Sequence, residues 1–253
     1  MNNIEYSFLI TLLAGLSTMV GSFLIFFKFK DISTVLSSSL SFAAGVMITI
    51  SIIELIPSAI NGILQKYYLV PGILIALIFI IIGIVVSNCI NKYIPDINVD
   101  KIEDFRLYKV GLISMIAIIL HNIPEGIATF MAGNTDIELG LSMAIAIALH
   151  NIPEGISISI PIYYSTKSRG KALLYTFISG ISEPFGAMIT YLFLQPFIND
   201  KIMGFLFSII AGIMIHIATY ELLPAANKYK DKNRVVKWII IGSLIMIVSH
   251  FVF

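Results

Sequence analysis

The sequence predicts an all-α integral membrane protein with eight transmembrane helices. Three observations indicate this fold class: 58% of the residues are hydrophobic, only 12% are charged, and the mean hydropathy is +0.94. The apolar residues form eight segments, each close to the roughly 20 residues that a ~30 Å hydrocarbon core requires. These segments are 7–27, 37–57, 69–90, 108–132, 139–161, 171–194, 202–225 and 235–253. We therefore expect one transmembrane domain over residues 1–253, with no soluble domain.

The first segment, 7–27, lacks a basic stretch before it and a small-residue cleavage site after it. We interpret it as a retained helix and not as a signal peptide. The loops after the first, third, fifth and seventh segments, together with the first three residues of the segment that follows each loop, carry 14 of the 16 Lys and Arg residues. Because cytoplasmic loops are enriched in these residues, both termini are expected outside the cell membrane.

The second and seventh segments are related by an internal repeat. Residues 43–59 align without gaps on residues 210–226, and the first and sixth segments share a similar pattern of small residues. Helices 1–3 (about 7–90) and helices 6–8 (about 171–253) then form two copies, separated by the central pair of helices 4–5 (about 108–161). Since three plus two is odd, the copies cross the membrane in opposite senses. This 3+2+3 inverted repeat is typical of secondary transporters.

The central pair carries the hexapeptide His-Asn-Ile-Pro-Glu-Gly twice, at 121–126 and 150–155. Ionisable residues are rare in the middle of membrane helices, where they usually mark a pathway or a binding site. In each copy, His and Glu are four residues apart and so share one helix face. Pro at the fourth position loosens the helix one turn earlier. Two such half-sites facing each other predict a divalent-cation site.

The charge balance supports this interpretation. The eight segments contain five acidic residues, whereas Lys and Arg occur only within the first three residues of a segment. Buried carboxylates without a basic partner are either protonated or compensated by a bound cation. The candidate metal ligands of the central set are His121, Asn122, Glu125, His150, Asn151, Glu154 and Glu183. Mixed imidazole, carboxylate and amide ligands suit Zn(II), Fe(II), Mn(II), Co(II) and Cd(II) better than Cu(I).

The doubled hexapeptide, Ser182-Glu183-Pro184 and the eight-helix pattern resemble the ZIP (Zrt-, Irt-like) metal transporters over the whole chain, most closely their compact bacterial branch. The resemblance implies a binuclear centre between helices 4 and 5. It places His121, Glu125, His150 and Glu154, approached by Met47, in a first site. Asn122, Asn151 and Glu183 form the second, which shares Glu125 and Glu154. It also implies that helices 1, 4, 5 and 6 move against helices 2, 3, 7 and 8, often in a homodimer.

Some residues outside the centre keep two interpretations. Glu54 and Glu221 occupy equivalent repeat positions, near the outer and inner helix ends, and serve either as outer and inner pathway carboxylates or as helix-end anchors. His216 is either an exit ligand or a packing residue, and His250 is interpreted as an interfacial residue. The loop from 91 to 109 contains no His, so we expect no metal sensor there.

We therefore expect a secondary transporter that moves divalent transition metals, Zn(II) foremost, into the cytoplasm by elevator-type alternating access. The metal is cargo, no cofactor is expected, and the bilayer is the other partner, with no nucleic acid. The location expected is a bacterial cytoplasmic membrane. The alternative is an intramembrane metal-dependent hydrolase, but zinc proteases of that kind favour His-Glu-x-x-His, which is absent here. The protein is therefore not expected to be an enzyme. Proton coupling and metal preference stay open.

Overall fold

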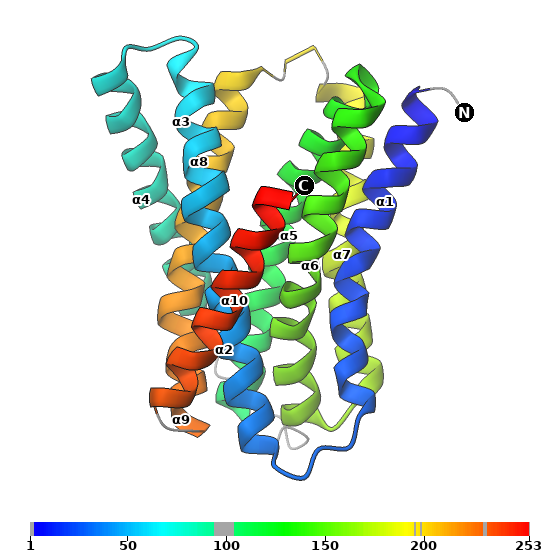
Figure 1. The fold of residues 1–253 in the computed structure, drawn as a ribbon, viewed down its shortest axis with the longest axis vertical. Coiled ribbons are helices and arrows are strands. Elements are labelled where there is room, and N and C mark those ends of the chain that lie inside the picture. The colour runs from blue at the N-terminus through cyan, green and yellow to red at the C-terminus, as the bar shows by residue number, and fades with distance from the viewer. Residues whose placement is uncertain (1–2, 94–103, 195, 198, 230–231, 253) are drawn as a thin grey trace.

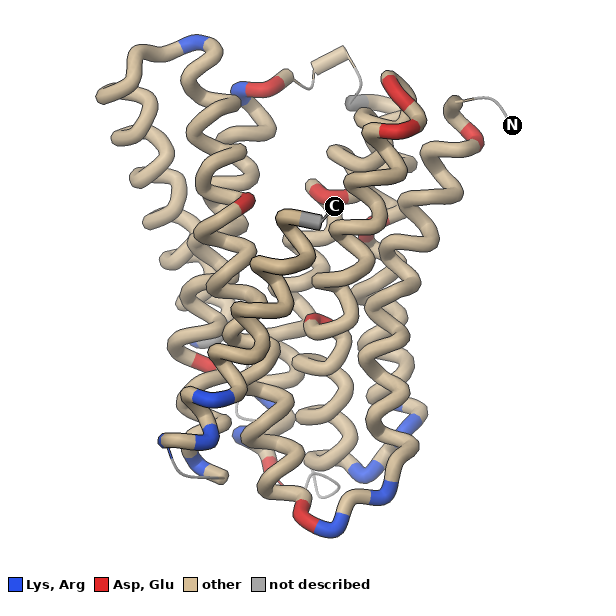
Figure 2. The backbone as a smooth tube through the Cα atoms, in the orientation of Figure 1, with Lys and Arg blue, Asp and Glu red and all other residues tan. Residues whose placement is uncertain are grey.

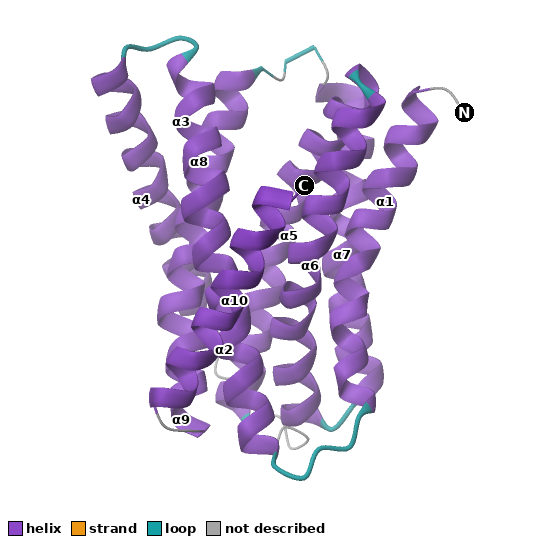
Figure 3. Cartoon of the chain, viewed as in Figure 1, coloured by secondary structure: helices purple, strands orange, loops and turns teal. Residues whose placement is uncertain are grey.

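The computed structural model describes residues 3–93, 104–194, 196–197, 199–229 and 232–252. Within these ranges the chain forms helices and loops and no strand (Figure 3). The loop residues 94–103, which include most of the loop expected to lack a metal sensor, lie outside the described part. Eight helical stretches are long and apolar enough to cross a membrane. The predicted all-α class and the eight spans are therefore confirmed.

Each predicted segment lies within one observed helical stretch or overlaps it closely. The stretches are α1 (Asn3–Ser22) with the short helix η1 (Phe23–Phe26); α2 (Ile32–Ile50), η2 (Ser51–Leu55) and α3 (Ile56–Leu64); α4 (Leu69–Tyr93); α5 (Phe105–Thr135); α6 (Ile137–Thr166); α7 (Arg169–Ile189) with η3 (Thr190–Leu194); α8 (Asp200–Ile217), η4 (Ala218–Leu222) and α9 (Leu223–Tyr229); and α10 (Lys232–Val252). The helices extend a few residues beyond the apolar segments, because polar residues cap them outside the hydrocarbon core.

Five helices begin at a polar residue whose side chain accepts a hydrogen bond from a backbone N–H of the first turn. These residues are Asp31, Asp104, Asp136, Ser168 and Asn199. Such a cap is worth about 1 kcal/mol and defines where the helix starts.

Asp104 also joins two helices at the same end of the bundle. Its Oδ2 accepts hydrogen bonds from Tyr229 Oη, at 3.1 Å, and from Lys228 Nζ, at 3.3 Å. Burial opposes ionisation of Asp104, but these bonds and the one from the Leu107 N–H outweigh it and hold the pKa of the carboxyl below its usual value.

The helices form two groups (Figure 1). In the first group, α1, α5, α6 and α7 all pack against one another. In the second, α2 packs on α10, α3 and α4 pack on α8, and α9 packs on α2 and α10. The main contacts between the groups are those of α2 with α6 and of α5 with α8. The membership matches the two sets of helices that the family resemblance implies.

Helices η2 and η4 are single π-helical turns, which were not predicted from the sequence. They cover Ser51–Leu55 and Ala218–Leu222, whose positions differ by the same 167 residues as the aligned repeat. Pro57 and Pro224 follow them at equivalent places. A proline removes one backbone donor and its ring displaces the carbonyl four residues earlier, which favours a widened turn. The aligned prolines were the signal in the sequence that could have indicated both turns.

Lys and Arg gather at the end of the bundle opposite to the N-terminal start of α1, and few lie at the other end (Figure 2). Between the two ends the tube is almost entirely free of basic residues and carries a few acidic ones (Figure 2). This distribution is the one that the loop counts predict for a protein whose basic end faces the cytoplasm.

Candidate metal centre

The two hexapeptides meet because α5 and α6 are joined by one residue, Asp136, and run antiparallel. His121 lies 15 residues before Asp136 and His150 lies 14 residues after it. At 1.5 Å per residue, the two imidazoles are therefore about 22 Å and 21 Å from the connection and reach the same depth. Both helices continue through Pro124 and Pro153.

Three side chains from α5 and α6 form a compact ligand set. His121 Nε2 and His150 Nε2 each lie 2.9 Å from Glu125 Oε1. One ligand atom from each of the three residues lies within 4.8 Å of the others. Each residue is no more than 4% exposed. Imidazole nitrogens and a carboxylate oxygen at this spacing can bind one divalent ion.

Glu154 lies beside this set. Its Oε1 is 3.5 Å from His121 Nε2, and both of its carboxylate oxygens are buried without a hydrogen-bond partner. The structure therefore brings together all four residues that the family resemblance implies for a first site.

A second polar group lies around Asn151. Its Nδ2 donates to Glu183 Oε2 at 2.9 Å and to the Ala14 carbonyl at 3.0 Å. Asn122 Nδ2 donates in the same way to the Ser179 carbonyl at 3.0 Å. Because the amide nitrogens are held by α1 and α7, the Oδ1 atoms of both asparagines stay buried and unpaired. Those oxygens are the atoms that a hard cation would bind.

The glycines of the two hexapeptides explain how α7 comes close to α5 and how α1 comes close to α6. A Cβ added at Gly126 would collide with the Glu183 carbonyl, and one added at Gly155 would collide with the Thr18 carbonyl. Only Gly permits this approach of two backbones. The contact at Gly126 therefore brings Glu183 of α7 to the level of the hexapeptides, which places three buried carboxylates in one region of the bundle.

In the part of the chain that the structure describes, no buried Lys or Arg compensates these carboxylates. Among the described residues no Lys or Arg is buried, whereas Glu125, Glu154 and Glu183 are each at most 4% exposed. Nine buried side-chain atoms of the seven candidate ligands have no hydrogen-bond partner. Buried polar atoms in proteins are nearly always paired, so such a concentration needs an explanation. A bound cation would satisfy both the charge and the unpaired atoms.

Two of the remaining candidates, Met47 and His216, lie on helices of the second group. Met47 of α2 is 2% exposed and belongs to the apolar core. His216 is hydrogen-bonded through Nδ1 to Ser87 Oγ of α4 at 2.9 Å, and its ring stacks on Tyr220 at 4.8 Å. These contacts hold His216 inside the second group of helices.

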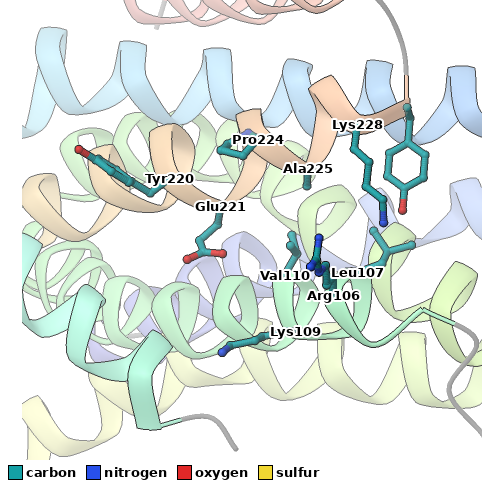
Figure 4. A pocket seen from close by; sticks show the side chains of 10 residues that line it. Arg106, Leu107, Lys109, Val110, Tyr220, Glu221, Pro224, Ala225 and Lys228 are labelled. Carbon is teal, nitrogen blue, oxygen red and sulfur yellow. The ribbon is translucent and has the colours of Figure 1, made fainter. Parts of the chain in front are cut away.

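Glu54 and Glu221 each line a cavity. Glu54 shares a cavity of about 70 Å³ with Glu125. Glu221 lines a cavity of about 270 Å³ near the basic end of the bundle, together with Lys109 and Tyr220. Figure 4 shows the Glu221 carboxylate directed into this cavity from η4, with Lys109 on the opposite wall.

A family model described as the ZIP zinc transporter matches residues 96–250. The chain belongs to the ZIP family. A zinc transporter ZupT of Clostridium perfringens is 40% identical over 278 residues, which cover 100% of this chain and 98% of the relative. A zinc transporter ZupT of Streptococcus mutans is 42% identical and covers 98% of this chain and 97% of its own length. A third, from Oceanobacillus iheyensis, is 41% identical over 98% of both chains.

Membership of the ZIP family confirms the resemblance that the doubled hexapeptide indicated. The names of the family and of these relatives indicate a transporter and not an enzyme, so the intramembrane hydrolase is not favoured. The eight spans and the bacterial relatives agree on a multi-pass protein of the plasma membrane.

Proposed function

We propose that this protein is a secondary transporter that carries divalent transition-metal ions, Zn(II) foremost, across the membrane into the cytoplasm. The buried set of His121, Glu125 and His150 is the observation that carries the proposal. Its ligand types suit a borderline divalent ion. The relatives named as zinc transporters support Zn(II) as the main cargo.

The centre holds one or two ions. His121, Glu125, His150 and Glu154 bind the first, and Met47 approaches it when the helices shift. Asn122, Asn151 and Glu183 bind the second and share Glu125 and Glu154 as bridging carboxylates. The unpaired oxygens of Glu125, Glu154 and Glu183 support this arrangement, because each carboxylate still has at least one oxygen free to bind.

The two cavities form the ends of the ion's route. The ion passes Glu54 on the outer side, exchanges its water for the central ligands, and leaves past Glu221 toward the basic, cytoplasmic end. The equivalent π-helical turns that carry these two glutamates support an inverted repeat with both termini outside. In such repeats the binding region lies near the membrane midplane and the two ends of the path are related by pseudo-symmetry.

Alternating access occurs by movement of the first group of helices against the second. The close backbone contacts of glycines support this step. Gly126 and Gly155 join helices of the first group, whereas Gly45 and Gly212 join helices of the second through Ile239 and Ile80. These close backbone contacts hold each group of helices together as one body. The two groups contact each other mainly through α2 with α6 and α5 with α8, and along this boundary one group can slide against the other.

The family resemblance also implies a homodimer, which we include in the proposal. The mass of the purified protein in detergent, measured by light scattering with the detergent contribution subtracted, tests it. A mass near twice 27.9 kDa supports the dimer, and a mass near 27.9 kDa contradicts it.

Flux into liposomes tests the transport function. The purified protein is reconstituted, and uptake of Zn(II), Fe(II), Mn(II) and Cd(II) is followed with an internal fluorescent chelator, with and without a pH gradient. We expect saturable uptake that Glu125→Ala/Glu154→Ala abolishes. The Glu138→Gln variant is the matched control, because Glu138 is an exposed carboxylate at the start of α6. A folded protein that shows no flux contradicts the proposal.

A further inference from the structure

A carboxylate and an imidazole lie close together outside the central set. Glu54 is in the π-helical turn η2, and His250 is in the last turn of α10. His250 Nδ1 lies 3.8 Å from Glu54 Oε2. The two side chains are 35% and 30% exposed, so an ion outside the protein can reach both. The sequence does not show this contact, because 196 positions separate the two residues.

Through Glu54 the pair adjoins a cavity that reaches the central set. Glu54 and Glu125 both line this cavity of about 70 Å³, which has room for several water molecules. Leu55, Ser58 and Phe207 of the second group form part of its wall, and Ala128, Met143 and Ile147 of the first group form the rest. The cavity therefore lies on the boundary between the two groups, with one carboxylate contributed by each.

The distance between the two ligand atoms suits a shared ion. Zn(II) lies about 2.0–2.1 Å from a His nitrogen and about 2.0–2.2 Å from a carboxylate oxygen. In a tetrahedral complex the two ligand atoms are then about 3.4 Å apart. The observed 3.8 Å requires a closure of about 0.4 Å, which a rotation of either partly exposed side chain supplies.

We propose that Glu54 and His250 form an outer capture site, which binds a divalent transition-metal ion before it reaches the central ligands. The inference rests on the proposed transport function. With two protein ligands and water in the remaining positions, the ion is held weakly. Weak binding is required there, because an ion on a multi-step path must bind well enough to be taken in and loosely enough to move on.

The charge of this end of the protein favours capture of a cation. Only Lys66 and Lys201 of the 16 basic residues lie in the loops assigned to the outer side. Figure 2 shows the acidic residues at this end, with most basic ones at the opposite end. A negative field around an opening raises the local concentration of cations and their association rate.

Metal binding by a variant without the central carboxylates separates this site from the centre. In Glu125→Gln/Glu154→Gln/Glu183→Gln, electron paramagnetic resonance titration with Mn(II) and calorimetric titration with Zn(II) measure what remains. We expect one weakly bound ion, which the further change His250→Gln removes and Glu138→Gln leaves in place. If no ion binds to the folded triple variant, or if His250→Gln leaves the binding unchanged, the capture site is refuted.

Flux through the otherwise intact protein provides the second test. We expect Glu54→Gln and His250→Gln each to raise the KM for Zn(II) about five-fold or more, with kcat changed less than two-fold. Because both side chains bind the same ion, the double variant should raise KM by much less than the product of the two single effects. Multiplicative effects, or unchanged KM values, contradict a shared site even when wild-type flux is normal. Absence of wild-type flux would instead refute the proposed transport function, and the binding titration would still decide the capture site.

Discussion

Glu125 is the ligand whose loss should weaken metal binding most. Its Oε1 lies 2.9 Å from the Nε2 atoms of both His121 and His150, so it is the carboxylate that joins the two hexapeptides. The change Glu125→Gln keeps the shape of the side chain and removes its charge. Glu154 and Glu183 stay in place, so the central set falls from three carboxylates to two.

The size of the effect follows from the charges. At an effective dielectric constant of about 20, a carboxylate and a divalent ion about 2.1 Å apart attract each other by about 16 kcal/mol. Dehydration of the ion and of the carboxylate offsets most of this, and removal of one partner from a buried ionic contact costs about 3–5 kcal/mol in practice. Since every 1.4 kcal/mol is a factor of ten, Glu125→Gln should weaken Zn(II) binding at least about 100-fold.

Calorimetric titration of the detergent-solubilised protein with Zn(II) measures this change, and flux into liposomes measures its consequence. Glu138→Gln removes an exposed carboxylate and serves as the control. A loss of affinity smaller than three-fold in Glu125→Gln, with the fold intact by circular dichroism, would refute the reasoning, because it would mean that the buried charge does not contact the ion.

Two further predictions concern stability. Gly126→Ala places a methyl group against the Glu183 carbonyl and should destabilise the protein by about 1–3 kcal/mol. A lower melting temperature in detergent checks this, while Gly170→Ala, whose added methyl makes only an ordinary contact 4.0 Å from Ser168 Oγ, should leave it unchanged. Because hydrogen bonds hold the pKa of Asp104 below its ordinary 3.8, the contribution of Asp104 to stability is complete above about that pH and is lost as the pH falls through the lower folded-state pKa. Asp104→Asn keeps a cap and removes the charge, so its melting temperature should fall less steeply below pH 4 than that of the wild type, and equal slopes would contradict the assignment.

Helix content and helix limits are the part of the fold that the sequence predicts best. No water is present in the bilayer core to form hydrogen bonds with backbone N–H and C=O groups. An apolar stretch of about 20 residues therefore forms an α-helix, which pairs these groups internally. The segments 108–132 and 139–161 are therefore contained in α5 and α6. The π-helical turns were not predicted, because each replaces only one turn within a continuous helix.

That the His and Glu residues of the two hexapeptides lie close together was also predictable, for a local reason. Each hexapeptide places its His and Glu on one helix face, and the single residue between α5 and α6 brings the two copies to one depth. The amide orientation of Asn151 was not predictable. It depends on the Ala14 carbonyl of α1 and the Glu183 carboxylate of α7, which are distant in the chain.

By itself, then, the sequence determined the class of the protein, its eight spans and the candidate metal-binding residues, because hydropathy and helical spacing act over short stretches of chain. Only the tertiary structure decided three contacts. His121 and His150 both contact Glu125 Oε1, His216 is hydrogen-bonded to Ser87 inside the second group, and His250 lies beside Glu54. Those contacts depend on how helices pack sideways. In a bilayer such packing is governed by small residues and by polar contacts between distant segments. The hydropathy of one segment therefore does not predict it.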